Sequence, residues 1–170
     1  GRITMPSLGV QVKMLSRQLG FALVGLIAFT NALVRTGGLF NIIPVIASVK
    51  MGLSVAQIGA GLAVGSVVGL IAAYPAGVLV DRYGRKAVIV PATIMSGVSM
   101  VLFCQALDLT WYLAACVLWG TATSVGGTAP AAYAADSAPP GQNAAAMSMF
   151  RMLGDLGYVT GPIALGMMVD

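Results

Sequence analysis

The chain contains no histidine and no glutamate, and its five acidic residues are all aspartate. Histidine and glutamate are common general acids, general bases and metal ligands, so their absence leaves few groups for such chemistry. We therefore expect no enzyme activity, no metal site and no cofactor. The only two cysteines, Cys104 and Cys116, lie inside apolar segments and are interpreted as small buried residues, not as a disulfide or metal pair.

Charged residues are also scarce, since they make up 8% of the 170 residues, whereas hydrophobic residues make up 58%. Soluble domains carry about 25% charged residues. A water-soluble core of this size could not bury so much apolar surface, so the lipid bilayer is the expected surrounding. The net charge of +4 comes from short breaks between apolar segments, and no basic stripe with interleaved aromatic residues indicates a nucleic-acid partner.

Five apolar segments are long enough to cross a bilayer, which takes about 20 residues as a helix. The sequence predicts an all-α transmembrane protein with helices over residues 19–47, 58–80, 87–107, 111–135 and 144–169. Ser54 and Thr110 are the predicted N-caps of the second and fourth helices. Residues 1–18 are predicted to form a polar cytoplasmic segment before the bundle of residues 19–170, and not a signal peptide.

Lysine and arginine predict the orientation of the bundle. With five spans, one side of the membrane holds only Lys50, and the other side holds Arg2, Lys13, Arg17, Arg82, Arg85 and Lys86. Cytoplasmic loops carry an excess of these bases, so the N-terminus is predicted to be cytoplasmic.

Glycines suggest an internal repeat and close helix packing. A shift of 89 residues aligns Gly65 with Gly154, Gly77 with Gly166, Val80 with Val169 and Asp81 with Asp170. Such a match between helices of opposite direction indicates an inverted repeat, which is typical of secondary transporters. Two rows of small residues recur every four positions, Gly61, Gly65 and Gly69 in one helix and Gly157 and Gly161 in another. They predict close helix–helix contacts. Such contacts are either static or form the surface on which two bundles rock.

Three motifs carry a resemblance to a known family. The run Gly77-x-Leu79-x-Asp81-Arg82-x-Gly84-Arg85-Lys86 resembles the signature loop between helices two and three of the major facilitator superfamily of secondary transporters. The run Gly157-Tyr-Val-Thr-Gly161-Pro162-Ile-Ala-Leu165-Gly166 is similar to the fifth-helix motif of drug–proton antiporters, with Leu165 in place of a glycine. The run Pro130-Ala-Ala-Tyr133-Ala-Ala-Asp136 resembles the cytoplasmic end of the family's fourth helix. The arginine that many members carry earlier in that helix, and that is tied to proton coupling, is absent.

The resemblance implies a helical bundle of the major facilitator type, with five helices of a six-helix N-terminal domain. It implies that further C-terminal helices or a partner chain complete the protein, and that a small-molecule substrate binds between two bundles. The implied function is secondary active transport by alternating access, with export of a drug or metabolite and a location in a bacterial inner membrane. Import of polar or anionic solutes, or a non-transporting role as a membrane scaffold, are the alternatives.

The signature loop is predicted to act as a conformational latch. Asp81 lies at the negative end of its own helix dipole and therefore needs a partner elsewhere. The resemblance implies that the partner is the positive N-terminus of a helix in the other bundle, gripped when the protein faces outward. Arg85 is expected to pair with Asp136, although the bases could also be simple positive-inside anchors. The predicted latch residues are Gly77, Asp81, Arg82, Gly84, Arg85 and Asp136.

Arg35 is the main candidate for a substrate contact, because an arginine inside a membrane helix costs about 2.5–3.5 kcal/mol and should face a cavity or a partner. Asn31 lies one turn earlier on the same face. Since the resemblance implies that the first and fourth helices line the central cavity, we expect its wall to include Asn31, Arg35, Thr121, Ser124 and Thr128. An anionic or polar solute would suit this wall, and the alternative is that Arg35 snorkels outward or pairs with a static acid.

The fifth helix carries the remaining candidates. Arg151 and Asp155 are four residues apart and could form a local ion pair, or Asp155 could pair with Arg35 or carry a proton. Gly157, Gly161 and Pro162 are a predicted hinge, or only a static kink, because proline removes a backbone donor. Gly37, Gly38 and Pro44 are similarly expected to loosen the first helix.

Overall fold

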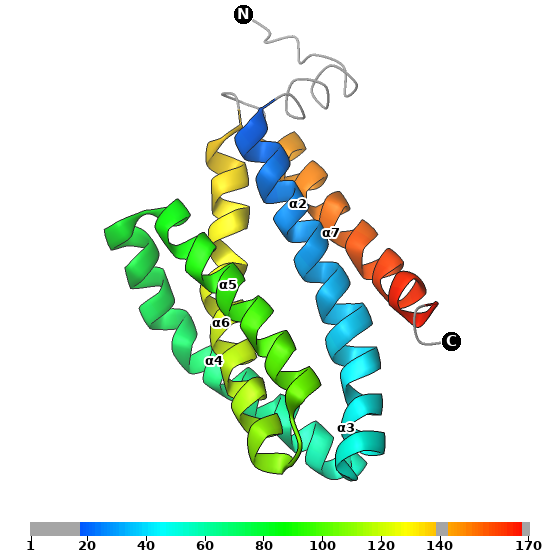
Figure 1. Ribbon diagram of the computed structural model, residues 1–170. Helices are drawn as coiled ribbons and strands as arrows, with labels where there is room; N and C mark the ends of the chain where they lie inside the picture. The colour runs from blue at the N-terminus through cyan, green and yellow to red at the C-terminus, as the bar shows by residue number, and fades with distance from the viewer. Residues whose placement is uncertain (1–17, 139–142, 168–170) are drawn as a thin grey trace, which may run out of the picture.

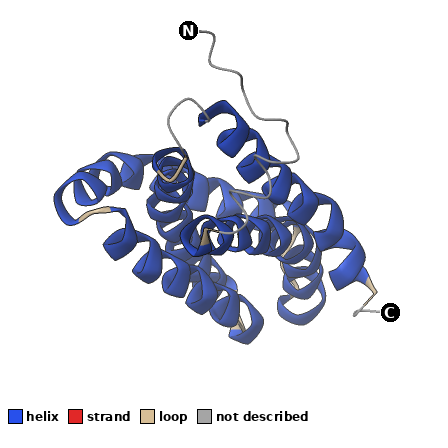
Figure 2. Ribbon diagram, turned by 90° about the horizontal axis from the view of Figure 1, so that it is seen from above, coloured by secondary structure: helices blue, strands red, loops and turns tan. Residues whose placement is uncertain are grey.

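The computed structural model describes residues 18–138 and 143–167, without the side chain of Thr128. Its elements are α2 (Leu19–Leu33), η1 (Val34–Ile42), α3 (Ile43–Met51), α4 (Val55–Tyr83), α5 (Arg85–Gln105), α6 (Leu109–Asp136) and α7 (Asn143–Gly166). Because α2, η1 and α3 follow one another without a break, they form one long first helix. The described residues thus fold into the five predicted helices, with ends within four residues of the prediction (Figures 1 and 2).

Three of the five helices are long and apolar enough to cross a membrane by length and composition, namely Leu19–Met51, Val55–Tyr83 and Arg85–Gln105. α6 and α7, which the sequence also predicts to be spans, fall outside this measure within the described residues, and α7 carries Arg151 and Asp155 near its middle. These two helices also supply most of the cavity wall described below.

Side-chain caps explain where α4 and α6 begin. Ser54 and Gln57 form a reciprocal capping box, in which the Gln57 N–H donates to Ser54 Oγ and the Ser54 N–H donates to Gln57 Oε1. The predicted cap of α4 is therefore confirmed. For α6 the prediction is wrong, because Asp108 rather than Thr110 is the cap and its carboxylate accepts from the Trp111 N–H at 2.9 Å. An aspartate also gains from the positive end of the helix dipole.

The helices pack in two groups, the first helix with α7, and α4 and α5 with α6 (Figure 1). Glycines allow both close contacts. A Cβ atom on Gly157 would lie 2.3 Å from the Phe29 carbonyl oxygen, and one on Gly65 would lie 2.6 Å from the Cys116 carbonyl oxygen. The predicted glycine rows therefore lie where helix backbones meet, as small residues do in membrane bundles.

The predicted internal repeat stays a prediction. Gly61 and Gly65 lie against α6, and Gly157 and Gly161 lie against the first helix. The predicted shift of 89 aligned Gly65 with Gly154, whose Cβ position has no neighbour within 4 Å among the described atoms. Two matched residues lie outside the described residues, Val169 and Asp170.

Two apolar clusters lie at opposite ends of the bundle. The α3-end cluster is built around the fully buried side chains of Leu39, Phe103 and Tyr112. The α2-start cluster is built around Phe21 and Val24, packed against residues of α6 and α7. In the first helix, the lining residues Asn31 and Arg35 lie between Val24 of one cluster and Leu39 of the other.

Candidate functional site

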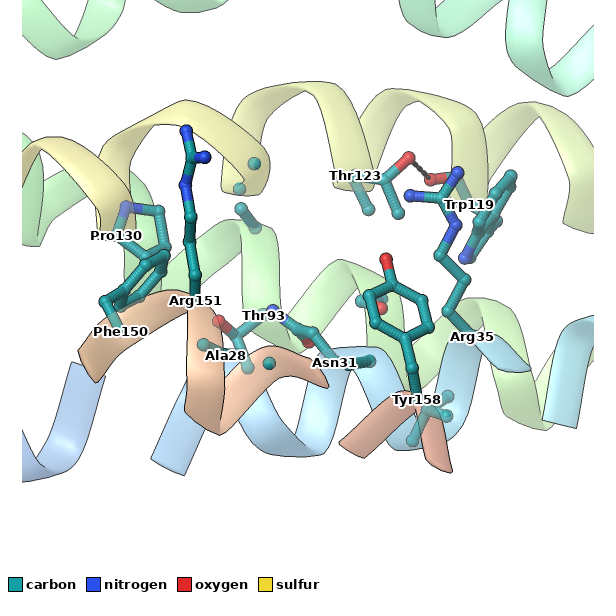
Figure 3. Close-up of a pocket in the computed structure, with 18 of the residues that line it drawn as sticks. Ala28, Asn31, Arg35, Thr93, Trp119, Thr123, Pro130, Phe150, Arg151 and Tyr158 are labelled. Atoms are coloured by element: carbon teal, nitrogen blue, oxygen red, sulfur yellow. Dashed lines mark hydrogen bonds between the residues drawn. The ribbon is translucent and has the colours of Figure 1, made fainter. Parts of the chain in front are cut away.

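A cavity of about 500 Å³ lies between the first helix, α5, α6 and α7 (Figure 3). The polar and charged residues that line it are Asn31, Arg35, Thr93, Ser96, Thr123, Arg151, Asp155 and Tyr158. The other lining residues are small, apolar or aromatic. Two guanidinium groups and one carboxylate give the lining a formal charge of +1.

Arg35 lies in a π-helical stretch of the first helix, η1. The predicted loosening near Gly37, Gly38 and Pro44 thus takes the form of a wider helical turn, which is frequent at functional sites. Asn41 supports this turn, since its side-chain amide donates to the Thr36 carbonyl oxygen. Gly37 is needed there, because an added Cβ would lie 2.5 Å from the Gly161 carbonyl oxygen of α7.

Two aromatic rings lie near the Arg35 guanidinium. Its Cζ atom lies 5.8 Å from the centroid of the Phe40 ring and 5.9 Å from that of Trp119, within the range of cation–π contacts. Among residues 18–138 and 143–167, no carboxylate lies within 4.0 Å of this group. Arg35 therefore lines a cavity, and among the described residues it lacks the static acid partner that was the alternative prediction.

Arg151 and Asp155 both line the cavity but do not pair. In the described part of the chain, no ion pair joins Asp155 to Arg151 or to Arg35. Figure 3 shows the Arg151 side chain extending from α7 toward α6 near Pro130. Both residues are exposed, so each charge can be solvated in the cavity without a partner. The predicted local ion pair is therefore absent.

The cavity face of α6 differs from the predicted one. Ser124 Oγ donates to the Gly69 carbonyl oxygen, so this residue faces α4, and neither Thr121 nor Ser124 lines the cavity. Because successive helical residues turn by about 100°, Thr123 points elsewhere than Thr121 and lines the cavity with Trp119. The side chain of Thr128 lies outside the described part of the chain.

Sequence reasoning missed several lining residues. Those that carry polar or aromatic groups are Thr93, Ser96, Trp119, Thr123 and Tyr158. The signal that could have found some of them is a second face of α6, where Trp119, Thr123, Gly126 and Pro130 follow one another every three or four residues.

A single glycine makes the turn between α4 and α5. Gly84 has φ 83° and ψ 157°, a conformation that is essentially restricted to glycine. The predicted break over residues 81–86 is therefore too long, since Asp81 and Arg82 still belong to α4 and Arg85 opens α5. The helix continues through these charged residues because only the conformation of Gly84 reverses the chain.

Replacing Gly84 with alanine is expected to lower the melting temperature of the detergent-solubilised protein. An L-residue in this conformation costs about 1–3 kcal/mol. Gly97→Ala is the matched control, because Gly97 lies within α5 and an added Cβ would meet no described atom within 4 Å. This control should keep or slightly raise the melting temperature, since alanine favours a helix. Equal melting temperatures for the two variants would show that the turn tolerates a side chain.

Arg85 and Asp136 form an ion pair, and Arg85 Nη1 also donates to the Ala132 carbonyl oxygen. Arg85 begins α5 and Asp136 ends α6, so each charge lies at the unfavourable end of its own helix dipole. Their pairing offsets both costs and joins α5 to α6. Next to it, Lys86 Nζ lies 5.7 Å from the centroid of the Tyr133 ring.

The opposite side of the signature loop is uncovered in the described residues. Asp81 is exposed and makes no ion pair with them, and an added Cβ at Gly77 would meet no described atom within 4 Å. Arg82 lies over the Tyr83 ring, with 5.6 Å from its Cζ to the centroid. Gly77 and Asp81 therefore form a surface that other parts of a protein could contact.

The predicted hinge residues lie in a continuous helix. α7 runs through Pro162 to Gly166, and Gly157 and Gly161 face the backbone of the first helix. The structure thus shows these two glycines as packing residues, and their role as a hinge stays a prediction.

Comparison with known proteins identifies the family. The sequence profile of the Major Facilitator Superfamily matches residues 21–170. No curated protein matches the chain. The profile match extends over all five helices of the described residues, three of which could cross a membrane on their own composition. The chain is an integral membrane protein that belongs to the Major Facilitator Superfamily of secondary transporters.

Proposed function

We propose that this protein exports a small solute through the cavity at Arg35 by alternating access. The observation that carries this proposal is a charged side chain within a membrane helix that opens to a cavity instead of pairing with an acid. Charged groups at such positions are rare and usually functional, because burying them in lipid is costly. Asn31 and Thr123 supply further polar groups to the same wall.

The signature loop is proposed to hold one of the two transport states. Asp81 and Gly77 would contact the N-terminus of a helix outside the described residues when the protein faces outward. Arg82 would support this surface, and Gly84 and the Arg85–Asp136 pair would hold α4, α5 and α6 together while it moves. The uncovered state of Gly77 and Asp81 in the described residues supports this proposal.

The proposed orientation places the Gly84 turn on the cytoplasmic side of a bacterial inner membrane. Three bases, Arg82, Arg85 and Lys86, lie at this turn. At the other end of the bundle, Lys50 of α3 donates to the Cys104 carbonyl oxygen at 2.9 Å. This asymmetry supports a cytoplasmic N-terminus by the positive-inside rule.

Export is favoured by the fifth-helix motif that resembles drug–proton antiporters. Gly157, Gly161 and Pro162 would let α7 move against the first helix. Asp155 is the one carboxylate among the described lining residues of the cavity, so it is the proposed site of any coupling to protons. The charged groups that share this cavity are Arg35 and Arg151.

Transport direction can be tested with the full-length protein in membrane vesicles of opposite orientation. Uptake of labelled tetraphenylphosphonium, glucose and 1-naphthoate should be measured in both kinds of vesicle, with and without a proton gradient. Export predicts that at least one solute accumulates in inside-out vesicles. Accumulation only in right-side-out vesicles would favour import, and no transport of any solute in either would favour a scaffold.

A further inference from the structure

We infer that the solute is a small organic anion with an aromatic body, whose carboxylate binds the Arg35 guanidinium. This inference rests on the proposed function and names the class of its substrate. It is carried by the placement of Arg35 near the rings of Phe40 and Trp119, at one end of a mixed polar and apolar cavity where Figure 3 shows Arg35 beside Trp119.

The guanidinium of Arg35 is positioned for an anion. The rings of Phe40 and Trp119 lie close to this group, and none of its N–H donors is paired with an acid among the described residues. Arginine offers these donors as a planar fork that matches the two oxygens of a carboxylate. A carboxylate would therefore satisfy the donors of Arg35 and neutralise its charge inside the membrane.

Two hydroxyl groups of the cavity, those of Thr93 and Thr123, already donate to backbone carbonyl oxygens. Thr123 Oγ1 donates to the Trp119 carbonyl oxygen at 3.0 Å, and Thr93 Oγ1 donates to the Ile89 carbonyl oxygen at 2.8 Å. Since a hydroxyl has one proton, both groups present only acceptor lone pairs to the cavity. The cationic donors for an anion are thus restricted to Arg35 and Arg151.

Two cationic groups lie at opposite ends of the cavity, and Arg35 is the better anion site. Figure 3 places Arg35 beside Trp119 and places Arg151 beside Phe150 and Pro130. Asp155 lies one turn from Arg151 on α7, where its charge opposes anion binding at that end. The formal charge around Arg35 therefore stays positive, and the anion should bind there.

The walls of the cavity suit an aromatic body. Ala32, Val34 and Ala122 line it together with the rings of Trp119 and Tyr158. The volume of about 500 Å³ falls within the usual range for small organic ligands and exceeds the need of an inorganic anion. Aromatic rings also prefer offset or edge contacts with other rings, which Trp119 and Tyr158 can provide.

Binding of three matched probes to the detergent-solubilised full-length protein tests the inference by calorimetry. The probes are 1-naphthoate, the neutral 1-naphthamide and the cationic 1-naphthylmethylamine, which share one ring system. We expect 1-naphthoate to bind at least about 10-fold more tightly than the other two, as a charge-assisted hydrogen bond would produce. Equal or tighter binding of 1-naphthamide or 1-naphthylmethylamine, or no binding of 1-naphthoate at millimolar concentration, would overturn the inference.

Variants then locate the anion. Arg35→Gln should weaken 1-naphthoate binding by about 10- to 100-fold, and Arg35→Lys should restore part of it. Lys50→Gln removes the same charge far from the cavity and should leave the affinity unchanged. Asp155→Asn should strengthen binding, because it removes a repelling charge. Unchanged affinity of Arg35→Gln, or weaker binding by Asp155→Asn, would overturn the assignment.

The remaining outcomes separate this inference from the proposed function. If Arg35→Gln does not fold, the probe series still tests the charge of the ligand, and Arg35→Lys still tests its site. Transport of tetraphenylphosphonium or glucose with no preference for 1-naphthoate would refute the inference that the substrate is an organic anion. It would leave the proposed transport function standing. Binding of 1-naphthoate at Arg35 without transport of any solute would support the site and refute the exporter.

Discussion

Gly120→Ala is expected to abolish the close contact between α4 and α6 and to cause the largest loss of stability of any alanine substitution at a described glycine. An added Cβ would lie 1.9 Å from the Gly65 carbonyl oxygen, 2.6 Å from its carbonyl carbon and 3.0 Å from its Cα atom. These atoms belong to backbone, so they cannot move aside as a flexible side chain could. Overpacking of this kind costs about 1–3 kcal/mol or more.

The measurement is the melting temperature and the folded yield of the variant in detergent. Gly127→Ala is the matched control, because Gly127 lies in the same helix and an added Cβ there would meet no described atom within 4 Å. We expect a clear drop for Gly120→Ala and none for Gly127→Ala. If the two variants were equally stable, the contact of α4 with α6 would be looser than the structure shows.

Asp81→Asn is expected to lower transport turnover by about 10-fold or more while leaving the fold intact. The substitution keeps the shape of an exposed side chain and removes only its charge. A carboxylate at a helix N-terminus can stabilise the state in which this contact forms by up to about 2 kcal/mol. This energy changes the ratio of the two conformational states by roughly 30-fold. Loss of this contact would destabilise the outward-facing state and unbalance the transport cycle.

Turnover should be compared with the amount of folded protein in the same membranes. Asp108→Asn is the matched control, since Asp108 caps α6 at the far end of the bundle and asparagine is an equally good cap. It removes one negative charge without touching the signature loop. Normal turnover in Asp81→Asn, or an equal loss in Asp108→Asn, would refute the latch.

The helices could be predicted from the sequence because bilayer thickness fixes the length of an apolar run. Their ends depend on local chemistry, so Ser54 was found correctly as a cap. The α6 cap was not, because Asp108 and Thr110 both stand near that break. The sequence does not show which of the two side chains accepts the hydrogen bond that caps the helix.

The candidate site was predicted only in part. Arg35 and Asn31 were found because a charge inside an apolar run is conspicuous. The predicted cavity-lining face of α6 differs from the observed one. The spacing of Thr121 and Ser124 shows that they share a face of the helix, but it does not show which neighbouring helix packs against that face. The π-helical form of η1 depends on contacts with α7, such as that of Gly37 with Gly161, which no local pattern contains.

Access of a thiol reagent to the cavity tests most directly the claim that this cavity opens alternately to the two sides of the membrane. Thr123→Cys, in a Cys104→Ser and Cys116→Ala background, places one thiol in this chain on the cavity wall. A membrane-impermeant maleimide should label it in vesicles of either orientation, and adding Asp81→Asn should shift labelling toward the cytoplasmic side. Labelling from one side only, with no shift on adding Asp81→Asn, would contradict alternating access through this cavity.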